Sequence, residues 1–191
     1  MNCITMSASA LAFDMAFVPA GWRLYVRFDL LMNKEMLLEQ FTACYDENNW
    51  FVAVKSALEG VTAEQAAWKP ENVDNSIWET VNHLIFWNER WLQRYRGELN
   101  EPQDVENKGT FKSSETDWQA TLAKLDEVMQ EWRSRLEAVT DEKLESPVNA
   151  EYQAPWRSPL AQQNVHNAYH IGQILLLRKL QGSWDPEKGV S

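Results

Sequence analysis

Apolar residues recur at helical spacing in four segments of the chain, and this pattern predicts four amphipathic helices. The first segment, 33–58, places apolar side chains at Leu38, Phe41, Tyr45 and Val52. The second segment, 76–96, places them at Ile77, Val81, Leu84, Trp91 and Tyr95. A glycine follows each segment, at Gly60 and Gly97, as is common where helices end.

The third segment has the most regular pattern. Its apolar residues alternate gaps of four and three along Trp118, Leu122, Leu125, Met129, Trp132, Leu136 and Val139. Such a seam is typical of a helix packed in a bundle, so Trp118 and Trp132 are predicted to be core residues. Ser114 and Asp117 stand just ahead of the seam and are predicted to form a capping box.

The fourth segment, 159–181, begins at a proline and is followed by Gly182. Few directions around it are polar, because apolar residues stand at Val165, Ala168, Ile171, Ile174, Leu175, Leu176 and Leu177. A helix that is apolar nearly all round is buried on several sides. In a chain of 191 residues, we expect the additional side to face a second subunit, which predicts a homodimer.

Long connections separate the four segments, at 60–75, 98–113 and 140–158. Each is long enough to cross the length of a bundle, so the chain is not restricted to simple up-down-up-down order.

The N-terminal 31 residues stand apart from this helical pattern. They contain a strand-like stretch at 22–28, and they lack the basic start of a signal peptide. We expect 1–31 to be a loosely attached extension or the product of an over-long reading frame. The main domain is then a single all-α domain over 32–191.

Composition excludes several classes of partner. The net charge is −10, which disfavours nucleic acid and anionic membrane surfaces. No apolar run reaches the roughly 20 residues that a membrane span needs. Cys3 and Cys44 form no disulfide framework, which favours a cytoplasmic protein with reduced thiols. Cys44 occupies a core-like position and is predicted to be a small buried hydrophobic residue.

The chain contains only three histidines. His166 and His170 are four residues apart, so both project from one face of the fourth helix and can share one cation. Alone, this pair is weak evidence for a metal site, because core and solvated histidines are commoner. His83 lies at the edge of the apolar face of the second helix. That position suits a site that is open to solvent, and it equally suits an ordinary exposed histidine.

Three histidines without a fourth protein ligand describe an open site of the kind that catalytic zinc uses. Position 167 is asparagine rather than the glutamate of HExxH, so the base of that metalloprotease motif is missing. Gln162 and Gln173, one turn from the histidine pair, are predicted to orient the imidazoles. Glu79 and Trp87 flank His83 by one turn on either side. Glu79 is a candidate ligand or base, and a solvated carboxylate is the simpler interpretation.

Three stretches carry a resemblance to a known family: "SIWETVNHLIFWNERW" from residue 76, "HNAYHIGQILLLRKLQG" from residue 166, and the tail "WDPEKGV". Over residues 33–188 the chain resembles the DinB/YfiT-like superfamily of damage-inducible DinB-like proteins. The name refers to induction by DNA damage and does not imply DNA binding.

The resemblance implies a four-helix bundle with one long crossover connection, in up-down-down-up order, that is commonly a homodimer. It also implies a divalent metal, zinc first and nickel second, on His83, His166 and His170. Two of these residues, His83 and His166, lie about two turns after their predicted helix starts, which fits parallel helices most simply. An antiparallel pair would have to meet nearer the middle of the bundle. Characterised relatives include a thiol-dependent isomerase and transferases that use bacillithiol, mycothiol or glutathione-like thiols. Many members have no known activity.

The leading functional expectation is a metal-dependent enzyme that transfers a low-molecular-weight thiol to an electrophilic small molecule. Candidate pocket residues are Trp78, Trp87, Trp156 and Arg157, although the last two equally suit a plain anchoring role. One alternative is a metal-dependent hydrolase that uses a metal-bound water. A second alternative is a non-enzymatic, stress-related protein that binds a metal or a ligand.

Overall fold

The computed structural model describes residues 34–99, 105–112 and 117–189, and every regular element in these ranges is a helix. Besides the helices, these ranges contain one isolated β-bridge, between Pro147 and Pro155. The predicted all-α class is therefore confirmed. The predicted extension, 1–31, and its strand-like stretch, 22–28, lie outside the described residues.

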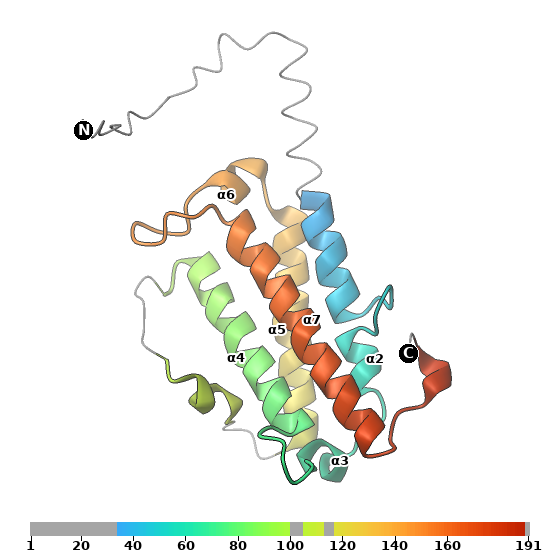
Figure 1. Ribbon diagram of the computed structural model, residues 1–191. Coiled ribbons are helices and arrows are strands. Elements are labelled where there is room, and N and C mark those ends of the chain that lie inside the picture. The colour runs from blue at the N-terminus through green and yellow to red at the C-terminus, as the bar shows by residue number, and fades with distance from the viewer. Residues whose placement is uncertain (1–33, 100–104, 113–116, 190–191) are drawn as a thin grey trace, which may run out of the picture.

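Four long helices form the body of the molecule: residues 34–45, α4 (Ile77–Arg96), α5 (Trp118–Ala138) and α7 (Arg157–Leu180). Shorter helices lie on the connections, namely α2 (Val54–Leu58), α3 (Ala63–Ala67), η2 (Asn107–Phe111), α6 (Asp141–Glu145) and η3 (Pro186–Lys188). Figure 1 shows α4 and α5 running in one direction, and 34–45 and α7 running in the other. The chain therefore returns along the bundle between α4 and α5, and η2 lies on that return.

The predicted first helix, 33–58, is wrong in its length. The chain is helical over 34–45 and again in α2, and a loop separates the two. The loop contains the polar run 46–49, in which Asn48 Oδ1 accepts a hydrogen bond from the backbone N–H of Ala53 at 3.0 Å. Asparagine and aspartate side chains compete with helical backbone bonds in this way. The apolar pattern continues through the loop because Val52 still reaches the core.

The ends of α4 follow their sequence signals. Ser76 accepts a hydrogen bond from the N–H of Glu79, the Glu79 side chain accepts one from the N–H of Ser76, and Gly97 ends the helix with a φ of 77°. The predicted cap of α5 needs a correction. Asp117 is itself the N-cap and accepts from the N–H groups of Gln119 and Ala120. Ser114 lies outside the described residues.

The core confirms the predicted seam of α5. Trp118 and Trp132 are almost completely buried, and their indole N–H groups donate to the carbonyls of Val61 and Asn88. Because each large ring also has a polar partner, neither indole is left with an unmet hydrogen bond.

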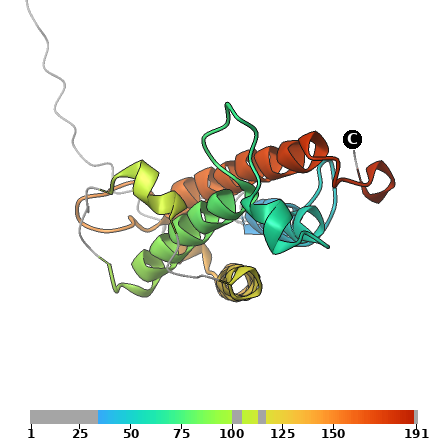
Figure 2. The ribbon, with the colours of Figure 1, turned by 90° about the horizontal axis from the view of Figure 1, so that it is seen from below.

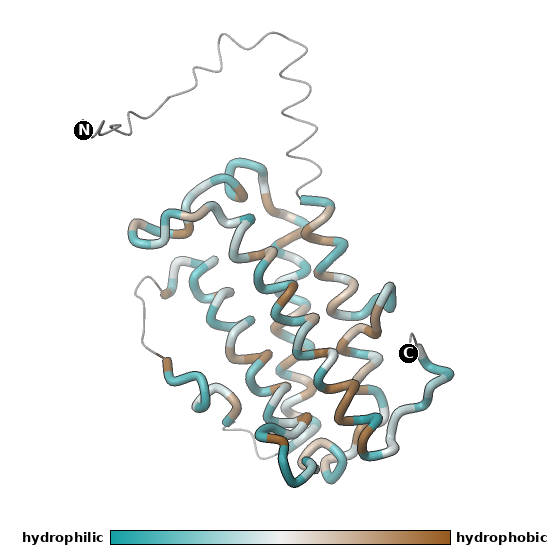
Figure 3. The backbone as a smooth tube through the Cα atoms, in the orientation of Figure 1, coloured by the Kyte–Doolittle hydropathy of each residue, from teal (hydrophilic) through white to brown (hydrophobic). Residues whose placement is uncertain are grey.

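The prediction that α7 is buried on several sides holds only in part. Ile171, Ile174 and Leu177 are buried, whereas Val165 is 68% exposed and Leu176 is 56% exposed. Figure 3 shows the hydrophobic stretch in the C-terminal half of this helix. No helix in the described residues is long and apolar enough to cross a membrane.

A buried amide pair joins α4 to α7, which lie side by side in Figures 1 and 2. Asn88 Nδ2 donates to Asn167 Oδ1 at 2.9 Å, and Asn167 Nδ2 donates back to Asn88 Oδ1 at 3.3 Å. Gln163 Nε2 also donates to Asn167 Oδ1, at 3.3 Å. Buried amides need their partners, so this network favours one register of α4 along α7.

We expect Asn88→Leu or Asn167→Leu alone to lower the free energy of unfolding by about 1–3 kcal/mol, because each leaves the other amide buried without its partner. The double variant should lose less than the sum of the two single losses. Urea unfolding followed by circular dichroism measures all three values. Additive losses would show that the two amides do not act as a pair.

Candidate metal centre

The packing of α4 against α7 brings the three histidines together. His83 lies in the first half of α4, and His166 and His170 lie near the middle of α7. The two helices are antiparallel (Figure 1), so the simpler parallel arrangement does not apply and the histidines meet nearer the middle of the bundle. Because α7 begins at Arg157, two residues before the predicted start, the histidine pair lies farther into the helix than expected.

The three imidazoles point their Nε2 atoms at one another. His166 Nε2 lies 3.2 Å from His83 Nε2 and 3.2 Å from His170 Nε2, and the three ligand atoms lie within 4.8 Å of one another. Tetrahedral zinc with bonds of about 2.0–2.1 Å places its ligand nitrogens about 3.3 Å apart. The observed spacing therefore fits a cation between the rings.

The orientation of His83 is fixed from the connection between α4 and α5. Its Nδ1 lies 2.6 Å from Thr110 Oγ1, and the Thr110 hydroxyl donates to the carbonyl of Asn107 at 2.6 Å. Because that hydroxyl proton is already used, Nδ1–H of His83 donates to Thr110. The lone pair of His83 is then on Nε2, directed at His166.

A similar chain of hydrogen bonds orients His170. Its Nδ1 lies 2.7 Å from Gln173 Oε1, and Gln173 Nε2 donates to the Tyr169 hydroxyl at 3.0 Å. The Gln173 oxygen is therefore the acceptor, and Nδ1 of His170 carries the proton. The lone pair on Nε2 of His170 also faces His166.

His166 has no such support. Its Nδ1 is buried and has no hydrogen-bond partner, and Gln162, which the sequence placed beside it, makes no hydrogen bond to it. The Nε2 lone pairs of His83 and His170 thus both face Nε2 of His166, which can carry at most one proton. A cation at this point would satisfy all three nitrogens, so the residues present fit a metal ion.

The imidazoles are neutral at pH 7, which is the form that binds metals. Burial, and after it the charges of the neighbouring histidines, lowers the pKa of His83 to about 3. Burial and the nearby His170 lower the pKa of His166 to about 4. Burial also lowers the pKa of His170, although its bond to Gln173 opposes this effect.

The end of η2 covers the site on the α4 side. The ring of Phe111 stacks on His83 with a centroid distance of 4.1 Å and an interplanar angle of 15°. His83 is only 2% exposed, which excludes the alternative of an ordinary exposed histidine. Thr110 and Phe111 were not found from the sequence, because they lie in a connection without any periodic pattern.

A cavity of about 300 Å³ opens beside the histidines, lined by Trp87, Trp91, Asn107, Pro159, Gln162, Gln163 and His166. The ring of Trp87 also meets the His83 ring edge-on, at 6.3 Å between centroids. Trp87 and Gln162 therefore lie at the site, and His166 is the ligand residue that the cavity reaches.

Glu79 has a structural role in the observed fold. Its carboxylate accepts a hydrogen bond from the N–H of Ser76 at 2.7 Å and lies 3.1 Å from Lys69 Nζ. Burial alone would raise the pKa of Glu79, but these bonds outweigh burial and lower it. The carboxylate is a helix cap, and it does not belong to the histidine cluster.

The other sequence candidates anchor the bundle. Trp156 is completely buried against Trp91 and Tyr95. Trp78 donates from its indole N–H to a threonine of α5 and packs on Trp118. Arg157 forms an ion pair with a glutamate of α6. None of these three residues lines the cavity at the histidines.

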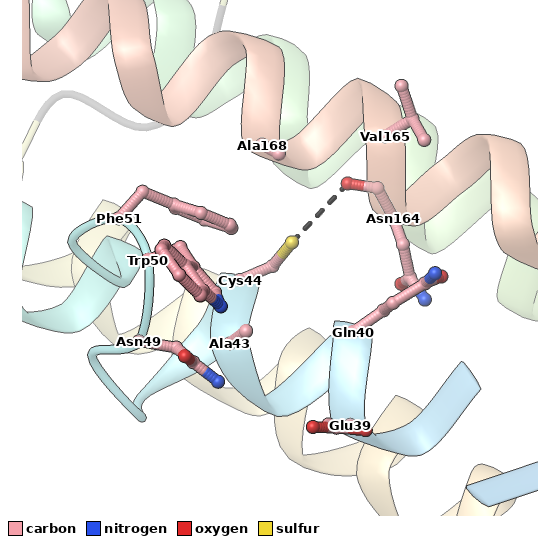
Figure 4. Close-up of a pocket in the computed structure, with 10 residues that line it drawn as sticks. All are labelled: Glu39, Gln40, Ala43, Cys44, Asn49, Trp50, Phe51, Asn164, Val165 and Ala168. Carbon is pink, nitrogen blue, oxygen red and sulfur yellow. Dashed lines mark hydrogen bonds between the residues drawn. The ribbon is translucent and has the colours of Figure 1, made fainter. Parts of the chain in front are cut away.

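A second cavity, of about 320 Å³, lies between 34–45 and α7 and contains Cys44 (Figure 4). The Cys44 thiol is 2% exposed and donates to the carbonyl of Asn164 at 3.3 Å. Burial raises its pKa to about 12. The prediction that Cys44 is a buried hydrophobic residue is confirmed, and its thiol is not a nucleophile near neutral pH.

The two glutamines provide a matched test of the metal centre. We expect Gln173→Leu to weaken zinc binding about 10–100-fold, because His170 loses the acceptor that fixes its tautomer. Gln162→Leu should leave zinc affinity within about twofold, because no hydrogen bond to His166 is lost. Competition with a chromophoric chelator measures both affinities. Equal losses in the two variants would contradict this account of His170.

One of three comparisons with known proteins identifies the family of the chain. A sequence model described as the DinB superfamily matches residues 51–174, a range that includes all three histidines. No curated protein and no solved structure matches the chain. Because the matched range covers more than half of its length, the chain belongs to the DinB superfamily.

Proposed function

We propose that the protein is a metal-dependent enzyme that transfers a low-molecular-weight thiol to an electrophilic small molecule. The observation that carries the proposal is the convergence of three neutral imidazoles beside a cavity, without a fourth ligand residue in the described cluster. A metal held there would bind the sulfur of the thiol and remove its proton.

Zinc is the proposed metal, with nickel as the second choice. Three imidazole nitrogens suit either ion, whereas magnesium and calcium prefer oxygen ligands. The 3.2 Å separations between nitrogens favour the tetrahedral geometry of zinc.

The residues of the chain have separate roles in this reaction. His83, His166 and His170 hold the metal, and Thr110 and Gln173 keep two of the rings in the correct tautomer. The thiol sulfur forms a bond to the electrophilic carbon, the leaving group departs with its electron pair, and the thiol proton passes to solvent. The cavity beside His166 positions the two reactants for this step.

Transfer is favoured over hydrolysis by the absence of a base. A hydrolase that activates a metal-bound water commonly uses a nearby carboxylate. No described residue that lines the cavity is acidic, and the Glu79 carboxylate caps α4. Cys44, the one cysteine among the described residues, is buried and protonated, and we therefore assign the reacting thiol to a co-substrate.

The test is turnover of a fluorogenic electrophile, monochlorobimane, by zinc-loaded protein with and without a panel of small thiols. We expect product only with thiol and metal together, and a loss of at least about a hundredfold in His166→Ala, because the metal contributes several kcal/mol. Gln162→Ala, also on α7 at the cavity, is the control and should keep the metal requirement.

Two other outcomes would contradict the transferase. Hydrolysis of an activated ester without any thiol would favour a hydrolase. Stoichiometric zinc without turnover, with His166→Ala changing only thermal stability, would favour a non-enzymatic binding protein.

We also propose that the protein is a cytoplasmic homodimer that pairs through α7. Four apolar side chains are more than half exposed along one stripe of this helix, at Val165, Tyr169, Leu176 and Leu180. Gly172 lies on the same stripe, and a Cβ added there would meet no atom within 4 Å. A second copy could therefore approach closely along this apolar stripe.

Light scattering after gel filtration tests the dimer. Leu176→Glu should shift the protein to a monomer, because it buries a carboxylate in the interface. Gln119→Glu adds the same charge on α5 and should leave the dimer intact. A monomeric wild-type protein would contradict this proposal.

A further inference from the structure

One exposed side chain links the surface of α7 to the histidine cluster. Tyr169 is 63% exposed, and its ring meets the His170 ring edge-on, with 5.0 Å between the centroids. The Tyr169 hydroxyl accepts a hydrogen bond from Gln173 Nε2 at 3.0 Å, and Gln173 Oε1 lies 2.7 Å from Nδ1 of His170. Two hydrogen bonds therefore connect the surface of the helix to a ring that is only 6% exposed.

This connection determines which nitrogen of His170 is free to bind a metal. A glutamine amide can present either its oxygen or its NH2 group to an imidazole. If the Gln173 amide turned over, Nδ1 of His170 would become the acceptor, and the ring proton would move to Nε2. The bond to the Tyr169 hydroxyl holds the amide in the orientation that leaves Nε2 free. Tyr169 is thus a positioning residue that acts on His170 through Gln173.

Water competes with this connection in a single copy of the chain. The bond between Gln173 and the Tyr169 hydroxyl lies at the exposed surface of α7. A hydrogen bond is electrostatically stronger where water is excluded. The orientation of the Gln173 amide therefore depends on what covers Tyr169.

The apolar stripe around Tyr169 has the spacing of a self-complementary surface. Tyr169 and Leu176 are equally far from the midpoint of the stripe, which falls directly after Gly172, and Val165 and Leu180 are also equally far from it. A two-fold axis at this midpoint would place Tyr169 beside Leu176 of the partner subunit, and Val165 beside Leu180 of the partner subunit. Interfaces with two-fold symmetry need this property, so a second copy is the partner that fits the stripe.

We propose that pairing of two copies along this stripe completes the metal centre. Leu176 of the partner subunit excludes water from the Tyr169 hydroxyl, the Gln173 amide is held in place, and His170 keeps its lone pair on Nε2. The dimer then binds the metal tightly, and the single copy binds it weakly. This inference rests on the proposed function and names the regulation of its metal site.

Zinc binding and dimerisation are linked in this arrangement. If each site binds zinc about threefold to tenfold more tightly in the dimer, as expected for one strengthened hydrogen bond, zinc must tighten the dimer about tenfold to a hundredfold, because each dimer holds two sites. Sedimentation equilibrium of the full chain, with zinc and with EDTA, measures the dimer dissociation constant in both states. Equal constants would overturn the inference.

Tyr169→Phe removes the hydroxyl and keeps the ring. At a concentration where the protein is a dimer, chelator competition should show a zinc affinity about threefold to tenfold below that of the wild type. Tyr152→Phe is the control, because Tyr152 is 40% exposed on the connection before α7 and contacts none of the histidines. It should bind zinc as the wild type does. An unchanged affinity in Tyr169→Phe would also overturn the inference.

Leu176→Glu breaks the dimer without altering the hydrogen bonds to His170. The monomer should bind zinc about threefold to tenfold more weakly than the wild type, although its added negative charge alone would attract a cation. Gln119→Glu adds the same charge on α5 and should keep both the dimer and the zinc affinity. A Leu176→Glu monomer that binds zinc as tightly as the wild-type dimer would contradict the role of the partner subunit.

The outcomes separate this inference from the proposed function. A wild-type protein that binds no zinc would contradict both. Thiol-dependent turnover with a zinc affinity that is the same in monomer and dimer would contradict the inference alone. Linked zinc binding and dimerisation without thiol transfer would support the inference and contradict the transferase.

Discussion

The packing of α4 against α7 is the constraint on which the candidate site depends. His83 comes from one helix and the histidine pair from the other, so a shift of one turn would separate the rings by about 5 Å. The reciprocal amide bonds between Asn88 and Asn167 oppose such a shift, because both amides are buried and can be satisfied together in this register. The polar centre of the interface therefore supports the relative position of the three histidines.

The surroundings of the three imidazole rings then determine their charge and their tautomers. Burial keeps the imidazoles neutral, and Thr110 and Gln173 direct two lone pairs toward a common point. The cluster, as found among the described residues, consists of histidines alone and contains no carboxylate. The site can therefore hold a cation while leaving a face open to the cavity beside His166.

Periodicity in the sequence was sufficient to predict the features that repeat along a helix. The seam from Trp118 to Val139 predicted α5 almost to the residue, and the four-residue spacing of His166 and His170 placed both on one face. Features that depend on contacts between distant segments could not be read in this way. Phe111 covers His83 from a connection, and the direction of α7 relative to α4 follows from the path of the whole chain.

Polar side chains that suit more than one role left alternatives open. The same carboxylate of Glu79 suits a metal site, a base or a helix cap, and only its bond to the N–H of Ser76 shows which applies. The break after 34–45 was missed because Val52 continues the apolar pattern through a loop.

The buried thiol of Cys44 has a consequence if the protein acts on electrophiles as we propose. Alkylating agents react with thiolates, and a thiol with a pKa of about 12 is almost entirely protonated in a cell. The bundle would thereby protect the Cys44 thiol from the electrophiles of the proposed reaction. Such a catalyst would survive repeated exposure to compounds that inactivate enzymes with a cysteine at the active site.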